Sequence, residues 1–181
     1  MKFKEQKLNG VFLIEGEPFE DDRGAFRRNY CEREFKEAGV DYNIAQCNIS
    51  ENRYKNTLRG FHYQLGPHGE AKTLTPYLGA FYDVVVDLRK DSPTFMQWQS
   101  FELRPEDKIS LHVPKGCANA FFTLEDNSII HYYSSQFYKS DFERGVRFSD
   151  PQFNFDWPSK PAIVSEKDAS WADFDKEINA Y

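Results

Sequence analysis

Short apolar stretches separated by turn-forming residues run along the chain between residues 42 and 148. The stretches are rich in aromatic and β-branched residues, which favour strands. The segments between them contain Gly, Pro, Asp or Asn, as at Gly66-Pro67 and Pro114-Lys115-Gly116, which is typical of turns. The predicted strands lie within residues 42–49, 57–64, 73–88, 95–103, 109–113, 118–124, 128–135 and 144–148. Strands of this length and spacing predict an all-β sandwich or barrel.

The two ends of the chain are less regular. Residues 10–19 mix apolar residues with turn formers and predict a short strand that leads into a loop. Residues 31–39 place Phe35 among charged residues and end in Gly39, as a short helix with a glycine stop would. After Asp150 the composition becomes irregular and proline-bearing. We expect one more short helix over residues 169–178.

Length and charge limit the classes of function. The 181 residues suit a single domain spanning residues 1–181. A formal net charge of -6 provides no general attraction to nucleic acid or to an anionic membrane. The three cysteines are an odd number without CxxC spacing, and the N-terminus lacks the apolar core of a signal peptide. We therefore expect a soluble cytoplasmic protein with reduced thiols.

Four histidines are the first candidates for chemistry: His62, His68, His112 and His131. A metal-dependent cupin needs several ligands on facing strands, typically a His-x-His pair, a Glu and a later His. Here the pair reads His62-Tyr63-Gln64, and Asn119 stands where the later His would fall. We therefore expect neither a metal nor another cofactor.

His62 has a simple structural interpretation and a functional one. A lone strand histidine is usually satisfied by hydrogen bonds in the core. However, Arg59 precedes it by three positions and Lys72 follows in the next predicted strand. On a barrel the inward faces of these strands converge, so a base and two cations would share one cavity.

Short motifs spread over nearly the whole chain have an order and spacing that chance does not explain. They are Asp22-Arg23-Gly24-x-Phe26, Gln46-x-Asn48-x-Ser50, Leu58-Arg59-Gly60-x-His62-Tyr63-Gln64, Ala71-Lys72, Asp83-Val84-x-Val86-Asp87-Leu88-Arg89, Ser92-Pro93-Thr94-Phe95, Pro114-x-Gly116, Asp150-Pro151, Trp157-Pro158 and Ser165-x-Lys167-Asp168. In these motifs the sequence resembles the dTDP-4-dehydrorhamnose 3,5-epimerase family. The resemblance implies an all-β, cupin-type jelly-roll barrel or sandwich with a few short peripheral helices.

The resemblance also implies how the cavity works. His62, oriented by Asp168, would remove a proton from a carbon beside the keto group of a nucleotide-linked 4-keto sugar. Lys72 would stabilise the developing enolate oxygen. The acid on the opposite face is a tyrosine in the family, which corresponds to Tyr132 here, with Tyr133 as the alternative if the register slips by one.

Each of these residues has a competing structural interpretation. Most charged strand residues, including Lys72 and Arg59, would lie on a solvated face. Asp168 would cap a helix, and each tyrosine would pack in the core with its hydroxyl hydrogen-bonded.

Nucleotide contacts are the next implication of the resemblance. The expected substrate-binding residues are Arg23, Phe26, Arg28, Gln46, Asn48, Arg59, Asn119, Glu143 and Lys167. Where the family has a Glu two places after the Phe, this chain has Arg28, and Cys47 replaces an Asp. Arginine offers only donors, which suit a guanine edge. We therefore favour a GDP-linked sugar, either a hexose or a heptose, with a dTDP-linked sugar as the alternative.

Three other functions compete with an epimerase: a nucleotide-sugar 3,4-ketoisomerase on the same fold, a non-catalytic sugar-binding jelly roll, and a metal-dependent cupin. By resemblance, the protein would be a homodimer joined by exchange of N-terminal strands. Its pathway would be deoxysugar and surface polysaccharide biosynthesis.

Overall fold

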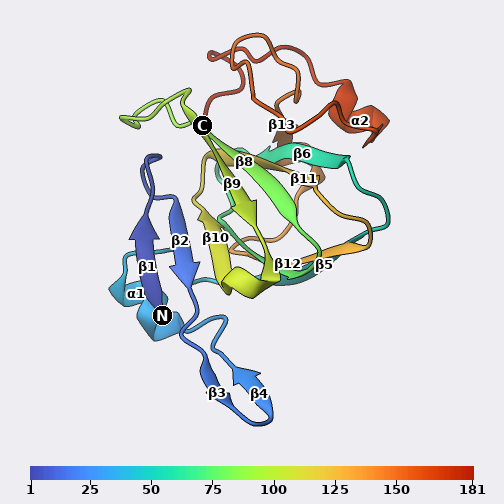
Figure 1. The fold of residues 1–181 in the computed structure, drawn as a ribbon. Coiled ribbons are helices and arrows are strands. Elements are labelled where there is room, and N and C mark those ends of the chain that lie inside the picture. The colour runs from blue at the N-terminus through green and yellow to red at the C-terminus, as the bar shows by residue number, and fades with distance from the viewer.

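Two sheets that face each other form the body of the molecule in the computed structural model, which describes all 181 residues (Figure 1). The first sheet has the order β1 (Lys2–Glu5), β2 (Phe12–Glu15), β10 (Ile109–Val113), β7 (Lys72–Leu78), β12 (Ser128–Ser134) and β5 (Gln46–Asn52). The second has the order β13 (Glu143–Gly145), β6 (Thr57–Gln64), β11 (Cys117–Thr123), β8 (Phe81–Asp87) and β9 (Trp98–Leu103). The pairs along these orders are antiparallel, and the two-residue strand β14 (Ile163–Val164) adds to β6 in parallel.

Smaller elements surround the two sheets. Strands β3 (Phe19–Asp21) and β4 (Gly24–Phe26) form a hairpin that projects from the body (Figure 1). The helices are α1 (Glu32–Glu37) and α2 (Glu166–Ala169), and two 3₁₀ turns, η1 (Pro105–Asp107) and η2 (Ser140–Phe142), complete the list. Neither α1 nor α2 has the length and apolar character of a membrane-spanning helix.

Alternation along the strands divides the apolar side chains between two cores. In β8, Phe81 and Val85 face the space between the sheets, where they pack with residues such as Leu111. Val84 and Val86 point to the other side of the same sheet. The sheet that carries β6 and β8 is therefore buried on both faces.

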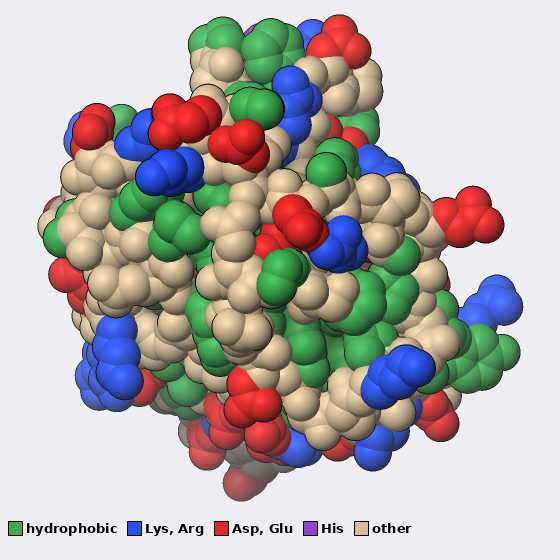
Figure 2. Space-filling model, turned by 90° about the horizontal axis from the view of Figure 1, so that it is seen from above, with side chains coloured by type: hydrophobic (Ala, Val, Ile, Leu, Met, Phe, Trp, Pro, Cys, Tyr) green, Lys and Arg blue, Asp and Glu red, His purple; other side chains and the backbone are tan.

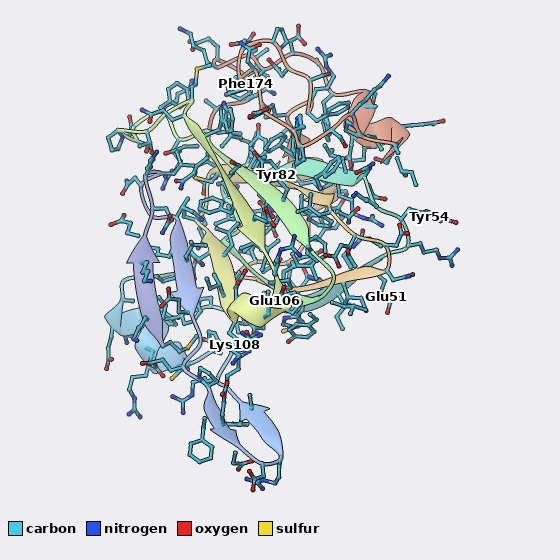
Figure 3. All side chains as sticks on the ribbon, in the orientation of Figure 1. Glu51, Tyr54, Tyr82, Glu106, Lys108 and Phe174 are labelled. Atoms are coloured by element: carbon cyan, nitrogen blue, oxygen red, sulfur yellow. The ribbon has the colours of Figure 1, made fainter.

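The C-terminal segment covers the outer face of the second sheet. Its side chains Phe153 and Phe174 are buried against β6 and β8, and Phe174 lies in the layer above Tyr82 (Figure 3). The Phe174 backbone N–H donates to the buried carboxylate of Asp150 over 2.6 Å.

Acidic and basic side chains are interspersed on the surface seen from above (Figure 2).

Each predicted stretch overlaps an observed strand, and the stretch 57–64 coincides with β6. The stretch 73–88 contains two strands, β7 and β8, and β1 was not predicted. The helix expected over residues 31–39 is present as α1, with Phe35 buried. The helix expected over residues 169–178 is wrong, because α2 ends at Ala169. The residues that follow instead dock Phe174 into the core, and a continuous helix would withdraw its backbone from Asp150.

Candidate active site

A cavity of about 450 Å³ opens between the two sheets at the inner faces of β6, β7, β11 and β12. Its wall combines cations, a histidine, a carboxylate and a tyrosine with apolar side chains. The lining residues are Ser50, Thr57, Leu58, Arg59, His62, Lys72, Leu74, Asn119, Phe121, Tyr132, Ile163, Val164, Ser165, Lys167 and Asp168. A mixed lining of this kind is typical of small-molecule sites.

His62 and Asp168 form a hydrogen-bonded pair at the wall of this cavity. The Nε2 atom of His62 lies 2.6 Å from Oδ1 of Asp168. The His62 side chain keeps 34% of its surface exposed, whereas that of Asp168 keeps only 5%. With Nε2 committed to the carboxylate, the other ring nitrogen, Nδ1, is the one left to act as a base.

The carboxylate of Asp168 is held by backbone groups as well. Its Oδ2 accepts the Gly60 N–H over 3.2 Å, and its own N–H donates to Oγ of Ser165 over 3.0 Å. Burial raises the pKa of Asp168, but His62 and these hydrogen bonds outweigh it and hold the pKa below its ordinary value. Asp168 is therefore ionised at neutral pH and can stabilise a protonated His62.

Gly60 allows β6 and β11 to approach closely beside this pair. Its φ is +112°, and a Cβ atom there would lie 2.6 Å from the carbonyl oxygen of Asn119. Only glycine accepts this combination of backbone conformation and contact. The glycine in the Leu58-Arg59-Gly60 motif thus sets the position of the strand that carries His62.

Lys72 reaches across from β7 in the first sheet to β6 in the second. Its Nζ donates to the carbonyl oxygen of His62 over 3.2 Å and lies 3.2 Å from Oε1 of Glu70. The ammonium group is thereby held beside His62, where it can stabilise a developing negative charge.

Tyr132 lines the cavity with His62 and Lys72, whereas Tyr133 does not. Alternation along β12 turns Tyr133 to the outer face, where its hydroxyl accepts the Asn29 side-chain amide over 2.5 Å. Of the two tyrosines considered from the sequence, Tyr132 is the one that faces the cavity.

A second, more polar cavity of about 260 Å³ adjoins the first and shares His62, Lys72 and Tyr132 with it. It also contains the predicted Gln46, Asn48 and Glu143, together with Glu70 and Tyr138, which sequence reasoning missed. No motif marked Glu70 or Tyr138, because each joins the site through a loop.

Two of these polar residues hold the loop that carries Tyr138. Oε1 of Gln46 accepts the Tyr138 backbone N–H over 2.7 Å. Oε2 of Glu143 accepts the Tyr138 hydroxyl over 2.7 Å and also pairs with Lys167. Burial raises the pKa of Glu143, but Lys167 and Tyr138 outweigh it and lower the pKa overall.

Arg59 and Asn119 line the main cavity, each with a buried partner behind it. Nε of Arg59 donates to the Asn52 side-chain oxygen over 2.8 Å. The Asn119 amide lies 3.2 Å from a carboxylate oxygen of Asp83. Burial raises the pKa of Asp83 to about 8. Asp83 was missed as a candidate, although a carboxylate inside the apolar strand FYDVVVD was a visible signal.

Three predicted nucleotide contacts lie outside both cavities of their own chain. Arg23 pairs with Asp21 within the β3–β4 hairpin. Phe26, in the same hairpin, is 78% exposed. Arg28 donates to the carboxylate of Glu34 in α1 over 2.7 Å. One chain alone does not bring these residues to His62.

The other three histidines line neither cavity, and the ring of His68 packs edge-on against Phe142. His112 is buried and bonded to the Thr73 hydroxyl, and His131 stacks on Tyr77. No group of three or more His, Cys, Asp and Glu side chains is arranged to hold a metal ion. The expected absence of a metal stays a prediction.

Comparison with known proteins gives a consistent result over nearly the full length. A family model described as dTDP-4-dehydrorhamnose 3,5-epimerase matches residues 5–176. A protein of Shigella flexneri with the same description is 36% identical over 93% of both chains.

Solved structures resemble the whole fold. The crystal structure of dTDP-4-dehydrorhamnose 3,5-epimerase from Elizabethkingia anophelis superposes with a TM-score of 0.93 at 37% identity, covering 99% of this chain and 98% of that one. The enzyme of the same name from Bacillus anthracis, with TDP and pyrophosphate bound, gives 0.92 at 36% identity and covers 96% and 99%. The fold class is thereby confirmed. These relatives favour neither the ketoisomerase nor the sugar-binding alternative.

Proposed function

The chain belongs to the dTDP-4-dehydrorhamnose 3,5-epimerase family, and from this membership we propose that it inverts carbon 3, carbon 5 or both in a nucleotide-linked 4-keto-6-deoxy sugar. Both carbons flank the ketone at carbon 4, so loss of a proton from either leads to an enolate. The observation that carries the proposal is that His62, Lys72 and Tyr132 line one cavity.

The reaction begins with the base. Nδ1 of His62 forms a new N–H bond as the C–H bond beside the ketone breaks. The electron pair forms a carbon–carbon double bond, and the keto oxygen becomes an enolate oxygen. The ammonium of Lys72 stabilises that oxygen, and the Asp168 carboxylate stabilises the protonated imidazole through the 2.6 Å contact.

Inversion requires a proton from the opposite face of the sugar, because return of the proton by His62 would restore the original configuration. The Tyr132 hydroxyl gives its proton to the carbon, and the ketone forms again. Proton exchange with water then returns His62 and Tyr132 to their starting states.

For the nucleotide, the proposal follows the relatives and takes a thymidine diphosphate sugar as the first substrate to test. The argument for GDP rested on Arg28 and Cys47. The guanidinium of Arg28 is engaged by Glu34, and Cys47 is exposed on β5 outside both cavities. GDP remains the second nucleotide to test.

Arg59 and Lys167 supply cations for the diphosphate, and Gln46, Asn48, Asn119 and Glu143 supply polar contacts.

The proposal is tested by incubation with dTDP- and GDP-linked 4-keto-6-deoxy sugars in deuterated water. We expect deuterium at carbon 3, carbon 5 or both by NMR, and inverted product. The Tyr132→Phe variant should still exchange but should not invert, whereas His62→Ala should do neither. If no deuterium enters any dTDP-, GDP-, CDP- or UDP-linked 4-keto sugar, the proposed activity is wrong.

The proposal includes a homodimer. Arg23 and Phe26 lie on a hairpin that projects from the two sheets (Figure 1) and line neither cavity of their own chain, so we expect them to contact a nucleotide bound to a second copy. The edge strand β1 also has no neighbour on its outer side, which suits pairing with another chain.

The remaining parts of the proposal concern the whole chain and its setting. Residues 1–181 act as one epimerase domain in the cytoplasm, in a route that makes deoxysugars for surface polysaccharide. In support, all three cysteines are free thiols. Fractionation of the producing cells would place the activity in the soluble cytoplasmic fraction if this is correct.

A further inference from the structure

The ammonium of Lys72 makes two contacts with the protein. It donates one hydrogen bond to the carbonyl oxygen of His62 at 3.2 Å, and it lies 3.2 Å from the carboxylate of Glu70. An ammonium group has three N–H donors. At least one of them therefore remains for a ligand in the cavity that Lys72 lines.

Glu70 is the one carboxylate that forms an ion pair with Lys72. Their side chains are only 10% and 13% exposed, so water and salt screen the pair weakly. Asp83 also interacts electrostatically with Lys72. However, burial raises the pKa of Asp83 to about 8, so this carboxyl group is mainly neutral at pH 7. Glu143 is engaged by Tyr138 and Lys167 instead.

The loop between β6 and β7, which carries Glu70, is fixed at several points. Nε2 of the buried Gln64 donates to the His68 carbonyl oxygen over 3.0 Å. The Leu65 N–H donates to the carbonyl oxygen of Phe142 over 2.9 Å, and the Tyr181 ring packs on Gly69. A carboxylate on such a loop has a defined position from which to hold a flexible lysine side chain.

We propose that Glu70 is a positioning residue for the epimerase reaction, which holds the Lys72 ammonium against the His62 carbonyl so that a remaining N–H faces the keto oxygen of the sugar. Lysine has a long side chain with many rotamers, and fixing it before the reaction avoids a cost at the transition state. This role rests on the proposed function, because it requires a sugar whose keto oxygen contacts the Lys72 ammonium.

The first test replaces Glu70 with Ala and with Gln. Glu70→Ala removes the contact, and we expect kcat for deuterium exchange to fall about 10-fold or more with KM within about 3-fold, because the orientation serves the transition state. Glu70→Gln keeps an acceptor oxygen of the same reach, and kcat should stay within about 3-fold of the wild type. An unchanged kcat in Glu70→Ala, or equal losses in both variants, overturns the proposal.

A double-mutant cycle shows whether Glu70 acts through Lys72. In the Lys72→Met background, the further change Glu70→Ala should alter kcat by less than about 2-fold. Additive losses mean that Glu70 acts in another way. Glu102→Ala, which breaks a surface ion pair with Arg104 outside the cavities, is the matched control and should leave kcat unchanged.

A crystal structure of the Glu70→Ala variant tests the positioning without any substrate. We expect Nζ of Lys72 to leave hydrogen-bond distance of the His62 carbonyl oxygen, and Nζ remaining there overturns the proposal. A wild-type enzyme that exchanges no nucleotide sugar would refute the proposed function, whereas this structure decides the role of Glu70 by itself.

Discussion

The hydrogen bond between His62 and Asp168 predicts the effect of removing one charge. Asp168→Asn keeps the shape of the side chain but cannot balance a protonated imidazole. We expect kcat to fall about 100-fold or more, within the range that general acid–base catalysis contributes, with little change in KM. The measurement is deuterium exchange into the sugar under saturating substrate. A variant that keeps half of the wild-type kcat would show that the Asp168 charge does not assist His62 as the base.

Asp83 predicts a pH dependence of stability. Its folded-state pKa is raised to about 8, whereas an aspartate in an unfolded chain titrates near 4. Between these values the folded protein holds the additional proton, so the free energy of unfolding falls as pH rises. His112, whose pKa burial lowers to about 4, gives the opposite slope only below about pH 6.5.

Above pH 6.5, therefore, Asp83 accounts for the falling slope without opposition from His112. The wild-type protein should lose on the order of 1–2 kcal/mol of unfolding free energy between pH 6.5 and 8 through this group, and Asp83→Asn should not show this loss. Urea unfolding of both proteins at these two pH values checks the prediction. Parallel losses in the wild type and the variant would contradict the buried, protonated state.

At this scale, the sequence predicted the position of residues that lie on the inward faces of strands. His62, Lys72 and Tyr132 were expected on inward faces, and all three line the cavity. Their catalytic roles stay predictions. Asp83 and Glu70 were missed because their importance depends on which side chain lies opposite, Asn119 in one case and Lys72 in the other.

Among the elements, the single-turn helix α2 holds Asp168 in place. Ser165 caps it by accepting the Asp168 N–H over 3.0 Å. Ser165→Ala should cost about 1 kcal/mol of stability and reduce kcat severalfold, because Asp168 loses one of its anchors. Thermal unfolding and exchange kinetics measure the two effects. Ser165→Thr, which retains a capping hydroxyl, is the control, and an equal loss in this variant would argue against the cap.

Elements with a regular pattern were predictable, whereas those set by docking were not. The stretch 57–64 gave β6 because it is a short run with aromatic and apolar residues, bounded by polar residues on one side and by Gly66-Pro67 on the other. The helix expected over 169–178 failed because burial of Phe174 and its bond to Asp150 outweigh helix propensity. Propensity is a weak guide where tertiary contacts decide the backbone.

For the whole molecule, the exposed β3–β4 hairpin predicts a site shared between two subunits. Sedimentation should show a dimer at micromolar concentration. If the hairpin contributes to the site of the partner subunit, a mixture of His62→Ala with an Arg23→Ala/Phe26→Ala variant should regain activity. After random subunit exchange, about a quarter of the sites combine an intact His62 from one subunit with an intact hairpin from the other. No recovery after subunit exchange, or a stable monomer, would contradict the shared site.

The family and fold were predictable because the motifs span nearly the whole chain, and both predictions are confirmed. The isolated sequence could not tell where Arg23, Phe26 and Arg28 lie relative to the cavity. Their position depends on how a hairpin leaves the body, and neither alternation nor spacing encodes that.

The partner that orients the catalytic base lies 106 residues after it in the chain. During synthesis on the ribosome, strands through β13 emerge while His62 still lacks its carboxylate. A nascent chain, or one cut before residue 168, would therefore lack the carboxylate that pairs with the His62 ring, and also Phe174, which is buried on the outer face of the second sheet. We therefore expect full activity only after the C-terminal segment has packed against β6, which β14 pairs with and Asp168 contacts.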